Sequence, residues 1–77
     1  MNIEVFAGLK AFYDKRFVVE EQLVSIADLK NYLIGRSPEA ASILQASRFA
    51  VNDELVALNY NLKADDNISV IPPSSGG

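Results

Sequence analysis

The residues of this chain that could do chemistry are few. The sequence contains no histidine and no cysteine, so Cys–His and Ser–His catalytic pairs and metal sites built from thiolate or imidazole are excluded. The carboxylates include the adjacent pairs Glu20-Glu21, Asp53-Glu54 and Asp65-Asp66. Adjacent side chains point to opposite faces of a strand, and in a turn both usually face water, so we interpret these pairs as solvated surface rather than acid–base or metal sites. We expect no metal and no bound cofactor.

The segment that differs from the rest is the last, Pro72-Pro73-Ser74-Ser75-Gly76-Gly77, which follows the apolar run 68–71. Proline has no N–H to donate to a sheet, so the chain must leave the sheet after Ile71. At about 3.3 Å per residue, the extended tail would reach roughly 20 Å. Its glycine end is slim enough to enter a channel that would exclude any side chain. A frayed terminus is the alternative interpretation.

Length and charge exclude other classes of protein. With 77 residues and a net charge of −3, the chain is one small domain without the clustered basic residues that bind a phosphate backbone. No apolar run approaches the ~20 residues that span a membrane, and the N-terminal residues do not form a secretory signal. We therefore expect neither nucleic acid nor a membrane as a partner, and we expect a cytoplasmic location.

The elements that must position the tail begin with a hairpin. Apolar residues alternate over 3–8, with Ala7 among the inward residues, which predicts a first strand. A turn over 8–15 then leads to a second strand at 17–19, which is rich in β-forming residues.

A capped helix follows the hairpin. Ser25 and Asp28 have the spacing of a capping box, which predicts the main helix near 25–34, and Gly35 is placed to end it in a left-handed conformation. Its inward face would consist of Ile26, Leu29 and Leu33. Ser37-Pro38-Glu39 repeats the start signal and predicts a short second helix over 40–44.

Three strands complete the predicted fold. They are expected at 49–51, 55–58 and 68–71, with turns over 52–54 and 64–67. Strands at both ends of a chain with a central helix indicate an α+β domain, in which one mixed sheet packs on the main helix beside the short second helix. We expect this domain to cover residues 1–71 and the flexible tail to cover 72–77.

A sheet covered by a helix on one face leaves its other face open. Phe6 and Ile71 alternate with the inward residues of their strands, and Leu55 is expected to join them. These three would form an exposed apolar patch beside the root of the tail, and such a patch marks a partner interface. The alternative is that the three residues complete the core.

Several segments together carry a family resemblance. The ending Val70-Ile71-Pro72-Pro73-Ser74-Ser75-Gly76-Gly77 is preceded by Leu62-Lys63-Ala64-Asp65-Asp66 and Val51-Asn52, and the chain opens with Val5-Phe6-Ala7 before the capped helix at Ser25. Over essentially its whole length the chain resembles the small subunits of molybdopterin synthase, which are ubiquitin-like β-grasp sulfur carriers. The specific part is the strand-Pro-Pro-x-x-Gly-Gly ending, since all ubiquitin-like carriers share a terminal Gly-Gly.

The resemblance implies that the chain is a non-catalytic subunit whose carboxylate at Gly77 is the functional group. An ATP-dependent adenylating enzyme would activate it, and a sulfur donor would convert it to a thiocarboxylate. That sulfur would attack cyclic pyranopterin monophosphate in the large catalytic subunit. Gly76 would give access, Pro72 and Pro73 would stiffen the tail, and the patch of Phe6, Leu55 and Ile71 would contact the large subunit.

Two other functions stay open. The chain could be a sulfur carrier for thiamine or tRNA thiolation, or a ubiquitin-like protein modifier or binding module. It also departs from the family at two places: the family typically has Gly-Asp where this chain has Asp65-Asp66, and it tends to have an aromatic residue where Ile71 stands.

Overall fold

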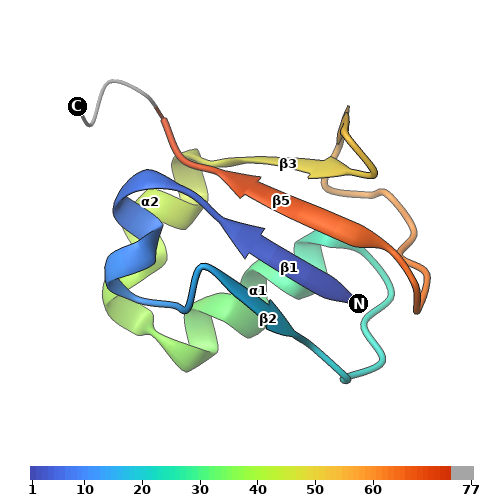
Figure 1. The fold of residues 1–77 in the computed structure, drawn as a ribbon, viewed down its shortest axis with the longest axis horizontal. Helices are drawn as coiled ribbons and strands as arrows, with labels where there is room; N and C mark the ends of the chain where they lie inside the picture. Colours follow the sequence, from blue (N-terminus) through green and yellow to red (C-terminus); the bar gives the residue numbers. More distant parts are fainter. Residues whose placement is uncertain (74–77) are drawn as a thin grey trace.

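The computed structural model describes residues 1–73, which form a five-stranded sheet with helices on one face (Figure 1). Within this range the elements in chain order are β1 (Asn2–Val5), the 3-10 helix η1 (Ala7–Ala11), β2 (Arg16–Val18), α1 (Ile26–Arg36), the 3-10 helix η2 (Pro38–Ala40), α2 (Ala41–Ala46), β3 (Arg48–Val51), β4 (Glu54–Val56) and β5 (Asn67–Ile71). None of the helices in this range is long and apolar enough to cross a membrane.

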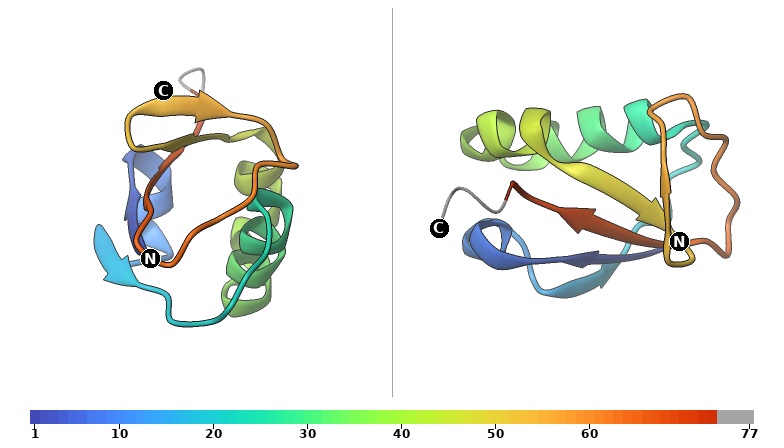
Figure 2. Two further views of the ribbon diagram at one scale, coloured as in Figure 1. Left: turned by 90° about the vertical axis from the view of Figure 1, so that its right-hand side faces the viewer. Right: turned by 90° about the horizontal axis from the view of Figure 1, so that it is seen from above.

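The sheet is mixed and brings the two ends of the described chain together. Its strand order is β2-β1-β5-β3-β4; β1 and β5 are parallel, and the other neighbouring pairs are antiparallel. Figure 2 shows α1 and α2 on the same side of the sheet, so the opposite face is open. The predicted α+β architecture, a β-grasp with a main helix and a short second one, is confirmed.

Apolar side chains from the sheet and the helices form one core between the two layers. The largest fully buried residues are Ile3, Leu9, Ile26, Leu29, Leu33, Leu44, Ile68, Val5, Val19 and Val70. Burying each of these side chains contributes about 1.5–3 kcal/mol before the cost of chain entropy. The predicted inward face of α1 is therefore correct, and so is its start. The Ser25 hydroxyl accepts from Asp28 N–H at 3.2 Å, and the Asp28 carboxylate accepts from Ser25 N–H at 3.3 Å.

The first strand is shorter than predicted. It ends at Val5, and Ala7 is exposed, with a φ of 51°, where η1 begins. The chain turns out of the sheet at this point because Leu9, inside the predicted turn, is buried in the core. The expectation of Ala7 as an inward strand residue was wrong.

The main helix also ends differently. Gly35 lies inside α1, and neither Gly8 nor Gly35 has a positive φ. The helix ends instead at Arg36. Ser37, which follows it, has a φ of −142° and donates its N–H to the Leu33 carbonyl at 3.1 Å. Ser37 precedes Pro38, and the residue before a proline is disfavoured in helical conformation.

The strand predicted at 55–58 ends at Val56. Beyond it the chain supplies hydrogen-bond acceptors to the first turn of α1. The Leu58 carbonyl accepts from Ala27 N–H at 2.9 Å, and the Tyr60 carbonyl accepts from Ile26 N–H at 3.1 Å. These N–H groups have no partner inside the helix, so bonding them stabilises the start of α1.

The interpretation of Asp66 as solvated surface was wrong. Asp66 is 3% exposed, and its carboxylate accepts from Lys63 N–H at 2.8 Å and from the Asn52 side-chain amide at 3.4 Å. It thereby fixes the turn that starts β5.

Asn52 and Asp53 form the two-residue connection between β3 and β4, with positive φ values of 50° and 72°. Both values are typical of a type I′ hairpin turn, which confirms the turn expected at 52–54.

Candidate partner-binding site at the root of the tail

The tail begins at the end of the central strand of the sheet. β5 is paired with β1 on one side and with β3 on the other, and it ends at Ile71 (Figure 1). Pro72 is half-buried and Pro73 is exposed. The point at which the chain leaves the sheet is thus held by two neighbouring strands. Gly76 and Gly77, like Ser74 and Ser75, lie outside the described residues.

The three residues predicted for the patch come together on the open face. Phe6, Leu55 and Ile71 line one hollow of about 380 Å³, together with Ala50, Asp53 and Ser69. Leu55 is 60% exposed, Ile71 is 39% exposed and Phe6 is half-buried. The exposure of Leu55 and Ile71 in the free chain argues against the alternative that these three side chains complete the core. We call this hollow the apolar hollow.

The register of the sheet explains why the face is hollowed there. Ala50 of β3 lies opposite Leu55 of β4 on one side and Ser69 of β5 on the other. Two small side chains therefore lie between the larger side chains of Leu55, Ile71 and Phe6, and they form the floor. Sequence reasoning missed Ala50, Asp53 and Ser69, because only the register shows that they lie between the predicted residues.

Charged side chains adjoin the apolar hollow. The Lys15 ammonium lies 5.2 Å from the centroid of the Phe6 ring and 3.6 Å from the Glu4 carboxylate. Arg16 lies 3.5 Å from the same carboxylate. Arg48 of β3 is the register partner of Ile71 and is exposed.

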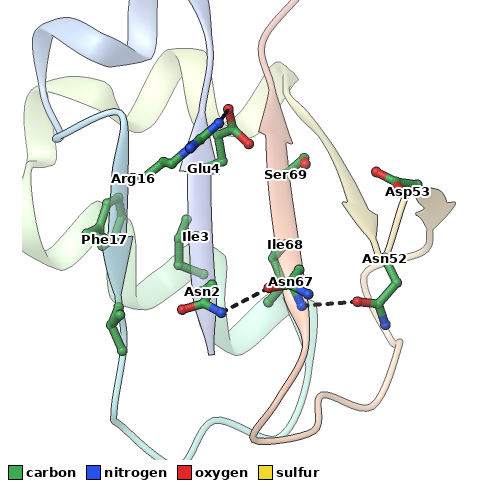
Figure 3. A pocket seen from close by; sticks show the side chains of 11 residues that line it. Asn2, Ile3, Glu4, Arg16, Phe17, Asn52, Asp53, Asn67, Ile68 and Ser69 are labelled. Atoms are coloured by element: carbon green, nitrogen blue, oxygen red, sulfur yellow. Dashed lines mark hydrogen bonds and ion pairs between the residues drawn. The ribbon is translucent and has the colours of Figure 1, made fainter.

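A second, larger hollow of about 590 Å³ lies on the open face toward the start of β1 and β5. Figure 3 shows a row of amides across it: the Asn2 amide donates to Asn67 Oδ1 at 2.9 Å, and Asn67 N–H donates to Asn52 Oδ1 at 3.2 Å. Asp53 and Ser69 line both hollows, so the two adjoin each other. The amides of the larger hollow are bonded to one another, and it contains no nucleophile with an adjacent base.

The remaining chemistry in residues 1–73 is structural. This part of the chain holds no group of three or more acidic, histidine or cysteine side chains that could bind a metal. Burial raises the pKa of the Tyr13 phenol, and the hydrogen bond with Ser37 and the nearby Arg36 partly oppose this increase. The Tyr13 hydroxyl donates to the Leu33 carbonyl at 2.6 Å, so it ties the loop before β2 to the end of α1. Tyr13 is thus engaged in holding the fold together.

Comparison with known proteins places this geometry in a family. The sequence model of the ThiS family matches residues 3–77. SAMP1 from Haloferax volcanii superposes with a TM-score of 0.74 at 23% identity, covering 99% of this chain and 97% of that one. A putative molybdopterin converting factor subunit 1 from Pyrococcus furiosus superposes with a TM-score of 0.73 at 20% identity, covering 94% of each chain. These two likenesses show the shared fold.

A third similar structure is a protein–protein complex. It contains subunits 1 and 2 of the molybdopterin-converting factor from Helicobacter pylori 26695. The matched chain superposes with a TM-score of 0.68 at 25% identity, covering 99% of this chain and 96% of that one.

Proposed function

Because the chain belongs to the ThiS family and has the fold of ubiquitin-like sulfur carriers, we propose that it is the sulfur-carrier subunit of a molybdopterin synthase. An adenylating enzyme uses ATP to convert the Gly77 carboxylate to an acyl-adenylate, and a sulfur donor displaces AMP to leave a thiocarboxylate. The sulfur then attacks cyclic pyranopterin monophosphate in the large catalytic subunit, and two such rounds build the dithiolene. We place these steps in the cytoplasm.

The observation that carries this proposal is the apolar hollow at the root of the Pro-Pro-x-x-Gly-Gly tail. An exposed apolar surface gives a partner something to bind. When a partner covers the hollow, β5 fixes where the tail starts, and the two prolines limit the directions it can take. The tail then reaches up to roughly 20 Å from Ile71. The apolar hollow thus binds the partner, and the tail beside it delivers the sulfur.

The Helicobacter pylori complex supports the choice of partner, because there a chain of this fold is assembled with subunit 2 of the converting factor. The proposal also agrees with the absence of histidine and cysteine in the chain. A thiocarboxylate is nucleophilic without a neighbouring base, so the carrier needs no catalytic side chains of its own.

The direct test is to incubate the chain with the adenylating enzyme, ATP and a sulfur donor, and then with the large subunit and precursor. Mass spectrometry should show exchange of oxygen for sulfur at Gly77, followed by conversion of the precursor and return of the carboxylate. A variant without Gly77 is the control and should give neither signal. Thiocarboxylation without precursor conversion would favour a carrier for thiamine or tRNA thiolation, and this would refute the synthase assignment.

A second candidate function is that of a protein modifier, favoured by the likeness to SAMP1, a small archaeal modifier protein. In that case the adenylated Gly77 would be joined to a lysine amine of a target protein. Peptides that carry a branched Gly-Gly on lysine, found in cells that express the chain and missing when Gly77 is deleted, would support this function.

A further inference from the structure

The charge around the apolar hollow is opposite to that of the whole chain. The chain has a net charge of −3, yet three basic side chains lie at the tail end of the open face. Lys15 is next to Phe6, Arg16 reaches Glu4 from the neighbouring strand (Figure 3), and Arg48 is opposite Ile71. We call Lys15, Arg16 and Arg48 the basic rim.

The acidic residues of this face do not neutralise the basic rim. Glu4 is shared between Lys15 and Arg16, and Asp53 lines the side of the apolar hollow away from β1. Glu54 is opposite the buried Val51, and strand alternation therefore puts its side chain on the other face from Leu55. Among the side chains of residues 1–73, the open face thus has three cations and two carboxylates and carries a positive charge, while the other side chains together are negative.

The existing ion pairs leave the cations available to a partner. The distances from Glu4 to Lys15 and Arg16, 3.6 and 3.5 Å, are longer than the 2.7–2.9 Å typical of strong charge-assisted hydrogen bonds. The Arg16 side chain is 75% exposed. Among residues 1–73, Arg48 forms no ion pair. Exposed pairs of this kind are weak, so a carboxylate from another molecule can replace or join Glu4.

We propose that the large subunit presents carboxylates to the basic rim, and that these charges orient it on the apolar hollow and speed its association. The inference rests on the proposed function, because it takes the large subunit as the occupant. The basic rim disfavours a second copy of the chain as the occupant, since two copies face to face would bring the same positive surface against itself, whereas a chain of this fold is assembled with subunit 2 in the Helicobacter pylori complex. Complementary charges around an apolar centre act mainly on the association rate, and they act less at high salt.

The test is charge reversal at one position of the basic rim, with a matched reversal elsewhere. Arg48→Glu is the test variant. Lys30→Glu changes the net charge by the same amount, but Lys30 is on α1, which covers the other face of the sheet, and it contacts Gln45. Association with the large subunit is measured by stopped flow at about 0.1 M and about 1 M salt, where the Debye length is ~10 Å and ~3 Å.

At the lower salt, Arg48→Glu should slow association about tenfold or more, and Lys30→Glu should change it less than about twofold. At the higher salt, the difference between the variants should largely disappear. Arg16→Glu should slow association as Arg48→Glu does. Agreement between the two variants excludes a folding defect at one site as the cause. Melting temperatures of all variants confirm that the domain is intact.

The outcomes separate this inference from the function on which it rests. If the wild-type chain binds the large subunit but Arg48→Glu and Arg16→Glu associate as fast as Lys30→Glu, the charge inference is overturned and the proposed function stands. If the wild-type chain does not bind the large subunit at either salt concentration, both fail. A wild-type dimer in sedimentation experiments that Leu55→Glu abolishes would show that a second copy is the occupant, and this also overturns the inference.

Discussion

Truncation of Leu55 tests whether the apolar hollow is a binding surface or only an incomplete part of the core. Burying a leucine side chain is worth about 1.5–3 kcal/mol in total. Leu55 is 60% exposed in the free chain, so about 1–2 kcal/mol of this energy is available only when a partner covers it. Leu55→Ala should therefore raise the Kd for the large subunit about 5- to 30-fold.

The same reasoning limits the effect on folding. Because most of the Leu55 side chain faces water, its truncation should change the free energy of unfolding by less than about 1 kcal/mol. Binding is measured by titration calorimetry, and stability is measured by urea denaturation of the free chain. Val24→Ala is the control, since Val24 is 67% exposed but precedes α1, outside both hollows of the open face.

The reasoning would be refuted by the opposite pattern. If Leu55→Ala lowers stability by several kcal/mol while the Kd stays within twofold of wild type, Leu55 is a core residue and the hollow is not a binding surface. If Val24→Ala weakens binding as much as Leu55→Ala, the open face is not the surface that binds the large subunit.

Four further predictions concern the turns, the half-buried phenol of Tyr13 and the tail. Asp53→Gly should raise the free energy of unfolding by about 0.5–1 kcal/mol in urea titrations, because glycine adopts the φ of 72° without a Cβ clash; a loss of stability would contradict this. Asp66→Ala should lower it by about 2–3 kcal/mol, because Lys63 N–H and the Asn52 amide lose a buried acceptor; a loss below about 1 kcal/mol would show that water replaces the carboxylate. The pKa of Tyr13 is raised by folding above its ordinary value of 10.0, so its contribution to stability is complete below that pH and is lost as the pH rises through the folded-state pKa. Wild-type stability should thus fall more steeply than that of Tyr13→Phe as the pH rises above about 10, and equal slopes would refute this. Deleting Gly77, or adding one residue after it, should abolish sulfur transfer without changing the melting temperature, since the carbonyl is displaced by roughly 3.3 Å; a variant that still converts precursor would exclude Gly77 as the sulfur-bearing residue.

Local signals predicted the parts of the fold that depend on neighbours in sequence. Ser25 and Asp28 predicted the start of α1 because a capping box lies within four residues of chain. The prolines after Ile71 predicted where β5 ends, because a missing N–H acts at its own position. Alternation in the strands also placed Phe6 and Ile71 on the open face.

Errors arose where distant segments decide the outcome. Ala7 left the first strand because Leu9 packs in the core, and the strand expected at 55–58 ended early because the Leu58 carbonyl bonds the start of α1. Asp66 is buried because Asn52, fourteen residues earlier in the chain, reaches its carboxylate. Only the register of β3 and β5, which places Arg48 opposite Ile71, shows that this charge lies beside the apolar hollow. No local pattern encodes these pairings.

The parallel pairing of β1 with β5 makes the hollow a property of the folded state alone. The register joins Asn2 to Asn67 and Val5 to Val70, so the centre of the sheet closes only when segments 65 residues apart in sequence meet. Phe6, Leu55 and Ile71 are likewise far apart in an unfolded chain and form no common surface. A partner that binds through the hollow therefore distinguishes folded carriers from unfolded ones. An unfolded chain can have the same tail, but it lacks the surface that would bring that tail to a partner.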